Sequence, residues 1–203
     1  LVVDAKIRAA VREVLAGLPK DADLRARVHA IYRHVITSTR YVGLEFGIHG
    51  FKPYRTTDVY DRRFGDCKDK ASLLKVMLAE AGIPSHLVLV RTRDQGTVGE
   101  APASLAAFNH AITYVPGLDL YLDGTAEFSG PEELPTGDQG ATVLIVKADS
   151  PYQSLKDLIE ATRANPGKIV YGAGGSVGSQ DWMKSALIAK QADVNYRSMR
   201  YVA

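Results

Sequence analysis

The chain has 203 residues, of which 46% are hydrophobic and 24% charged, as in an ordinary soluble protein with one full domain or one and part of a second. Its net charge is +2 and it has no basic run, so the sequence gives no electrostatic basis for binding nucleic acid or an anionic membrane. No apolar stretch approaches the roughly 20 residues that a bilayer span needs, so we expect no membrane-spanning segment.

The chain contains a single cysteine, Cys67. One cysteine excludes an internal disulfide and a zinc site built from several cysteines, and we expect neither a metal nor another cofactor. The chain begins with Leu1 and shows no basic and then apolar leader. We therefore expect a fragment of a longer protein, with any export signal outside it.

The first third of the chain has the pattern of helices joined by one extended segment. Apolar residues predict a helix over 1–17 and a second over about 21–35, with Asp21 or Asp23 as the N-cap of the second. Residues 37–50 are β-branched and then rich in glycine, which is typical of extended chain and loop. Residues 51–64 indicate a loop and a short helix.

The middle of the chain predicts one helix followed by strands. A helix begins near Cys67, and Gly82 followed by Pro84 ends it. Four apolar runs of strand length follow, and Pro116-Gly117 between the second and third predicts a hairpin. These runs are 87–92, 108–115, 118–123 and 141–146, with polar loops at 93–104 and 128–140.

After Lys147 the pattern changes from antiparallel hairpins to a strand, loop, helix and strand. A helix is predicted from Leu155 to Asn165, and it is followed by a strand, a glycine-rich loop, a helix and a strand at 169–171, 172–178, 179–192 and 195–202. This order is typical of a parallel α/β unit. We therefore predict two segments, 1–147 and 148–203.

Cys67 lies at the predicted start of a helix, between Asp66 and Lys68. The unpaired N–H groups and the dipole at a helix N-terminus favour a thiolate over a thiol, as a nucleophile requires. An imidazole would complete the activation by taking and returning a proton. The candidates are His29, His34, His49, His86 and His110.

The order of residues along the chain favours His110 as this base. It lies on a predicted strand, and Asp123 ends the next strand of the same hairpin, so the two can lie side by side and the acid can orient the ring. On spacing alone, a structural role remains an equal alternative, with Cys67 as a buried apolar residue and Asp123-Gly124 as a turn.

Several segments share a further pattern: Arg40-Tyr41-Val42-Gly43, Gly65-Asp66-Cys67-Lys68-Asp69-Lys70-Ala71, Leu73-Leu74, Ala81-Gly82-Ile83-Pro84, Asn109-His110 and Leu122-Asp123-Gly124-Thr125. Together they resemble the bacterial transglutaminase-like superfamily over about 20–146. The resemblance implies an α+β, papain-like core with the cysteine on a helix packed against an antiparallel sheet. It also implies a catalytic triad of Cys67, His110 and Asp123.

The glycine-rich loop at 172–178 lies between a predicted strand and helix, where anions often bind. It lacks the spacing of a dinucleotide fingerprint and the lysine of a phosphate-binding loop. Residues 150–203 resemble part of a solute-binding receptor of tripartite tricarboxylate transporters, which implies that Ser176 and Ser179 contact a carboxylate ligand. A flexible turn without a ligand is an equal alternative.

These patterns lead to one leading hypothesis, a thiol-dependent peptidase, amidase or transamidase acting on a peptide or protein amide. The alternatives are a catalytically silent transglutaminase-like scaffold and a carboxylate-binding module that uses 172–179. Both resemblances imply an exported, periplasmic bacterial protein. The acyl donor, the acceptor and the oligomeric state stay open.

Overall fold

The computed structural model describes residues 1–43, 46–96, 107–145, 155–168, 170–172, 186, 189–190 and 193–202. The chain forms two units according to its internal contacts. The first comprises Leu1–Gly96 and Asn109–Val146, and the second holds the described residues from 155 onward. Among the described residues, no helix combines the length and the apolar character needed to cross a bilayer.

Four helices form the helical part of the first unit, and the sequence predicted each of them. They are α1 (Ala5–Ala16), α2 (Leu24–Ser38), α3 (Thr56–Arg62) and α4 (Cys67–Glu80). Asp23 is the N-cap of α2, because its carboxylate accepts a hydrogen bond of 2.7 Å from the Ala26 N–H. Of the two predicted candidates for this N-cap, Asp21 and Asp23, the structure therefore has Asp23.

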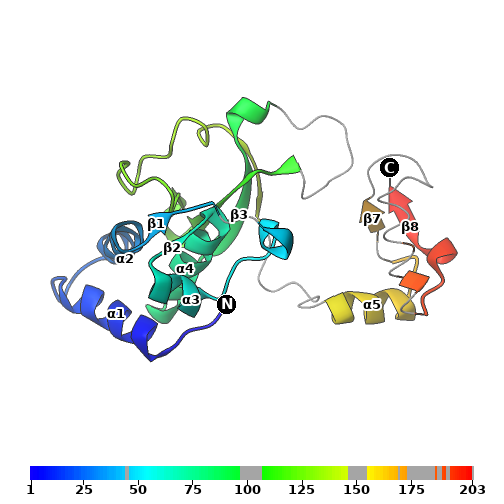
Figure 1. Cartoon of the computed structure of the whole chain (residues 1–203), viewed down its shortest axis with the longest axis horizontal. Coiled ribbons are helices and arrows are strands. Elements are labelled where there is room, and N and C mark those ends of the chain that lie inside the picture. Colours follow the sequence, from blue (N-terminus) through cyan, green and yellow to red (C-terminus); the bar gives the residue numbers. More distant parts are fainter. Residues whose placement is uncertain are drawn as a thin grey trace. The chain divides into compact units, whose positions relative to one another are not determined.

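A four-stranded antiparallel sheet completes the first unit (Figure 1), in the order β5-β4-β3-β6. Its strands are β3 (His86–Arg91), β4 (His110–Val115), β5 (Leu120–Leu122) and β6 (Thr142–Ile145). The predicted hairpin joins β4 to β5 through a 3-10 turn at Pro116–Leu118, and Thr113 pairs with Leu122. This register brings the first residue of β4 toward the segment that follows β5.

A second, very short sheet was not predicted. The strand β1 (Arg40–Tyr41) pairs in parallel with β2 (Phe64–Gly65), and the Val42 N–H donates to the Gly65 carbonyl over 2.9 Å. This ladder ends directly before α4. It therefore holds residues 40–42 beside the chain that leads into Cys67.

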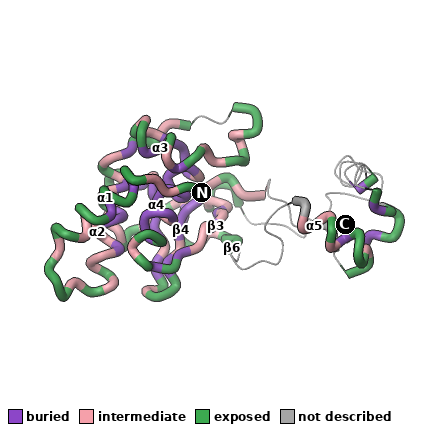
Figure 2. The backbone as a smooth tube through the Cα atoms, turned by 90° about the horizontal axis from the view of Figure 1, so that it is seen from below, coloured by how far each residue is buried: buried purple, intermediate pink, exposed green. Residues whose placement is uncertain are grey.

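The helix α4 is the centre of the first unit. Most of its side chains are buried, and Figure 2 shows the buried residues concentrated in α4 and β4. The main core joins α1, α2, α3 and α4 to the hairpin, and it includes the residues Ile7, Val11, Val28, Ile31, Tyr32, Val35, Val59, Leu73, Leu74, Met77, Leu78, Val115 and Leu122. A helix buried on most sides is a rigid support for its first residue.

The second unit contains α5 (Leu155–Ala164), β7 (Val170–Gly172) and β8 (Arg200–Val202). The strands β7 and β8 pair in parallel, as the sequence predicted. Ala189, Val194 and Met199 form a small buried cluster there. The predicted ligand residues Ser176 and Ser179 lie outside the described residues.

Candidate active site

Cys67 is the first residue of α4, and its position is set by the residues on either side of it. Asp66 is the N-cap, and its carboxylate accepts a hydrogen bond from the Asp69 N–H over 3.1 Å. The Asp69 carboxylate in turn accepts from the Asp66 N–H over 3.4 Å, which completes a capping box. Cys67 is buried, with 8% of its surface exposed.

Gly65 is required by close packing at this turn. A Cβ atom at position 65 would lie 2.6 Å from the Cβ of Asp69 and 3.2 Å from Cγ1 of Val59. Only glycine lets β2 pass this close to the first turn of α4. The presence of Gly65, Asp66 and Asp69 is therefore explained by geometry before any chemistry is considered.

The buried charges of Asp69 and of the next residue, Lys70, also have partners outside this turn. The Asp69 carboxylate also accepts from the Tyr54 N–H and from the Arg62 guanidinium, each over 2.8 Å. The fully buried Lys70 ammonium donates to the Thr39 carbonyl, and it lies 3.6 Å from a carboxylate oxygen of Glu127. Burial lowers the pKa of Lys70, and the charge of Glu127 opposes that shift.

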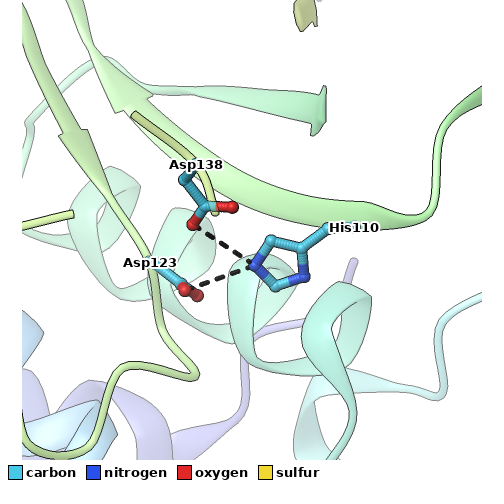
Figure 3. Close-up of side chains that lie close together, drawn as sticks. All are labelled: His110, Asp123 and Asp138. Carbon is cyan, nitrogen blue, oxygen red and sulfur yellow. Dashed lines mark ion pairs between the residues drawn. The ribbon is translucent and has the colours of Figure 1, made fainter. Parts of the chain in front are cut away.

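His110 and Asp123 lie together at the end of the β4–β5 hairpin. The distance from His110 Nε2 to Asp123 Oδ2 is 3.3 Å (Figure 3). A side-chain hydrogen bond with Cys67 is among the causes that raise the pKa of His110. The structure thus brings Cys67, His110 and Asp123 together in one chain of contacts.

Asp123 is held firmly in place. Its Oδ1 accepts hydrogen bonds of 2.8 Å from both the N–H and the hydroxyl of Thr125, and its carbonyl accepts one of 2.9 Å from the hydroxyl of Tyr32. Burial alone would raise the pKa of Asp123, but the hydrogen bond and charge of His110, with the bonds from Thr125, lower it. Asp123 is therefore the ionised partner of the ring.

The same contacts act strongly on His110. Burial alone would lower its pKa, but the hydrogen bonds and charges of Asp123 and Cys67 outweigh burial and raise the pKa of His110 to about 10. At neutral pH the ring is therefore an imidazolium, the form that can pair with a thiolate and later protonate a leaving amine.

A third acidic residue, Asp138, faces the same ring and was missed by the sequence analysis. Its Oδ2 lies 3.8 Å from His110 Nε2 (Figure 3). Burial raises the pKa of Asp138 to about 6, and the nearby Asp123 charge adds to this effect while His110 opposes it. The residue lies in the predicted 128–140 loop, and no local pattern there marks it as a partner of His110.

His110, Asp123 and Asp138 could also ligate a metal ion. One ligand atom from each lies within 4.8 Å of the others, the one such group among the described residues. A metal would need the electron pair of Nε2, which the imidazolium uses for its proton.

The other candidate histidines have different surroundings. His29 lies 3.3 Å from Glu132, His34 shares a hydrogen bond with Tyr60, and His49 stacks on the ring of Tyr54 at 3.6 Å between centroids. His86 begins β3, opposite Tyr114. None of these contacts involves Cys67.

Comparison with known proteins agrees with this geometry. The sequence profile of the Transglutaminase-like superfamily matches residues 8–119, more than half of the chain. The chain belongs to the transglutaminase-like superfamily. The match includes Cys67 and His110 and ends before Asp123, which lies 3.3 Å from His110 in the structure.

Two solved structures resemble this transglutaminase-like chain. A candidate protease from Parabacteroides distasonis is 21% identical, with a TM-score of 0.52 over 69% of this chain and 26% of its own. A candidate cysteine protease from Cytophaga hutchinsonii is 14% identical, with a TM-score of 0.44 over 68% of this chain and 46% of its own. The chain thus spans less than half of either relative. The first likeness supports the papain-like α+β fold.

The end of the chain is similar to a different family. The profile of the Tripartite tricarboxylate transporter family receptor matches residues 136–201. This range includes β6, which pairs with β3 in the sheet of the first unit. The search of curated proteins gave no significant match.

Proposed function

We propose that this chain catalyses thiol-dependent acyl transfer on amide bonds, with Cys67 as the nucleophile, His110 as the general base and acid, and Asp123 as the orienting acid. The observation that carries the proposal is the chain of contacts from Cys67 at a helix N-terminus, through the imidazolium of His110, to Asp123 at 3.3 Å. A buried structural cysteine has no need of an imidazolium partner.

In the first half of this reaction, the Cys67 thiolate attacks the amide carbonyl carbon and forms a tetrahedral intermediate. Residues at the first turn of a helix have N–H groups without an intrahelical acceptor, so the Cys67 N–H can stabilise the oxyanion. The C–N bond then breaks, and His110 gives its proton to the leaving amine. A thioester remains on Cys67.

In the second half, water or an amine attacks the thioester carbonyl while His110 takes a proton from the attacking group. The thiolate of Cys67 then leaves, which restores the ion pair with His110. Water gives hydrolysis and an amine gives transamidation, so one site supports both outcomes. We propose a peptide or protein amide as the acyl donor, in keeping with the candidate proteases that share the fold.

The receptor-like profile over residues 136–201 supports a proposal about location. Receptors of this kind bind solutes outside the cytoplasmic membrane, so we propose that the chain comes from an exported, periplasmic protein. Fractionation of cells that express the full-length protein would test this, and a cytoplasmic location would contradict it.

The enzyme proposal is tested by labelling with a panel of peptide electrophiles. Since the chain has one cysteine, any covalent mass increase reports on Cys67. We expect labelling of the intact chain, none in Cys67→Ala, and a strong reduction in His110→Ala. Full amidase activity in Cys67→Ala would refute the proposal.

A further inference from the structure

Asp138 has no role in the reaction above, yet it lies against the base. Its Oδ2 is 3.8 Å from His110 Nε2, the nitrogen that Asp123 Oδ2 approaches to 3.3 Å. The Asp138 side chain is 4% exposed, and its Oδ2 accepts no hydrogen bond from a donor among the described residues, while a side-chain hydrogen bond with Asp123 helps to raise the pKa of Asp138. A buried carboxylate oxygen without a donor costs folding free energy, so its position needs an explanation.

The backbone around Asp138 fixes the carboxylate in this position. The Gly137 carbonyl accepts a hydrogen bond of 2.8 Å from the Arg93 N–H, and the Asp138 N–H donates to the Pro135 carbonyl over 2.9 Å. The Asp138 carbonyl accepts from the Ala141 N–H over 3.2 Å, directly before β6. The segment is thus anchored on both sides of the residue, and the side chain faces the imidazole.

The charges that meet here come from three parts of the fold. His110 lies on β4, Asp123 follows β5, and Cys67 reaches the same ring from α4. The charge of Asp123 also acts on Lys70, on α4, whose pKa it raises against the larger effect of burial. With both carboxyl groups ionised and Cys67 as a thiolate, the imidazolium is the cation that touches all three anions.

We propose that Asp138 is a positioning residue that holds His110 as an imidazolium facing Cys67. The inference rests on the proposed function, because it assigns Asp138 to the same thiolate and imidazolium pair. A carboxylate near 4 Å from an imidazole favours the charged ring and disfavours the neutral one. Asp123, held by Thr125, orients the ring, and Asp138 adds a second negative charge beside it.

This role predicts that Asp138→Asn lowers the reactivity of Cys67 and raises the stability of the protein. Replacing Asp138 by the neutral Asn should weaken the support of the imidazolium and so make Cys67 less reactive. The same change removes a buried carboxyl group whose pKa is raised by burial, so the protein should become more stable at a pH where Asp138 is ionised. A residue with a merely structural role would give a loss of stability and no change in the pH profile.

The test is the rate of Cys67 alkylation by iodoacetamide between pH 4.5 and 9, with urea unfolding at pH 8. In Asp138→Asn we expect the midpoint of the rate profile to rise by about one pH unit, so that the rate below both midpoints falls about tenfold. The urea midpoint should also rise. Asp58→Asn, an exposed aspartate on α3, is the matched control and should change neither.

The outcomes separate this inference from the proposed function. A fast, His110-dependent rate in the parent chain with an unchanged profile in Asp138→Asn would overturn only the role of Asp138. A parent rate no faster than that of a free thiol would overturn both. Rates that change on adding EDTA would show a metal bound by His110, Asp123 and Asp138 and would also overturn the proposed role.

Discussion

Buried charged groups have different partners at the two sides of the candidate site, the start of α4 and the end of the β4–β5 hairpin. At the start of α4, Asp69 pairs with Arg62 at 2.8 Å, and Lys70 donates to the Thr39 carbonyl. At the end of the hairpin, the carboxyl groups of Asp123 and Asp138 converge on one imidazole, and Asp138 Oδ2 accepts no hydrogen bond from a donor among the described residues.

We expect the helix side to contribute mainly to the stability of the fold and the hairpin side to the reactivity of Cys67. The polar groups around Cys67 satisfy one another, so they fix the nucleophile and stabilise the fold. Of the two carboxyl groups beside His110, Asp123 is also held by Thr125, whereas Asp138 Oδ2 accepts no hydrogen bond from a donor among the described residues and is opposed only by the charge of His110. Substitutions on the helix side should therefore destabilise the protein, whereas Asp138→Asn should stabilise it and reduce reactivity.

The largest expected effect is that of Cys67→Ala, which should abolish amide hydrolysis or transamidation. The fold should persist, because alanine is a good helix former and little volume is lost at this position. Activity against a labelled substrate, with circular dichroism as the control for folding, checks this. Activity equal to that of the parent would show that another residue carries the reaction.

The next effect is that of Asp123→Asn on the sheet side. The neutral amide no longer stabilises the imidazolium or fixes the ring, so kcat should fall about 10³- to 10⁴-fold with little change in KM. His110→Ala should be at least as severe. Steady-state kinetics of the two variants provide the measurement, and a loss below tenfold in Asp123→Asn would mean that a different group orients the ring.

On the helix side, Asp69→Ala should lower the free energy of unfolding by about 2–4 kcal/mol. The change leaves the Tyr54 N–H and the Arg62 guanidinium without their carboxylate, and it breaks the capping box with Asp66. Urea unfolding gives the value. Asp58→Ala is the control and should change it by less than about 0.5 kcal/mol. An equal loss in the free energy of unfolding in both variants would contradict the stabilising role expected for the helix side.

The smallest expected effect is the pH dependence of the stability that Asp138 confers. Because the pKa of Asp138 is raised to about 6 in the folded state, its contribution is present below its ordinary value near 4 and is lost as the pH rises through 6. Asp138→Asn should therefore match the parent at pH 4 and exceed it by about 1–2 kcal/mol at pH 8. Unfolding curves at the two pH values measure this difference. A variant less stable than the parent at pH 8 would contradict it.

Local signals made much of this fold predictable. The caps, the helical spacing and the Gly82 stop predicted α2 and α4 to within a few residues, and Pro116-Gly117 predicted the β4–β5 hairpin. The same hairpin explains why the approach of His110 and Asp123 could be expected. Each of these features depends on residues close together in the chain.

The rest depended on packing between distant segments. The β1–β2 ladder joins positions 40 and 64 by two short parallel strands that have no period to detect. Asp138 reaches His110 across a loop whose proline, glycine and acidic residues indicate only irregular chain. Neither feature has a local signature, so only the folded chain shows it. The assignment of roles to Cys67, His110 and Asp123 stays a prediction until activity is measured.

The most direct test of the ion pair between Cys67 and His110 is the rate of iodoacetamide alkylation at pH 6, in the intact chain and in His110→Ala. A free thiol is almost fully protonated at this pH, whereas a thiolate held by the imidazolium is not. We expect the intact chain to react about a hundredfold faster than free cysteine, and His110→Ala to lose this advantage. A rate in the intact chain equal to that of free cysteine, unchanged by His110→Ala, would contradict the account.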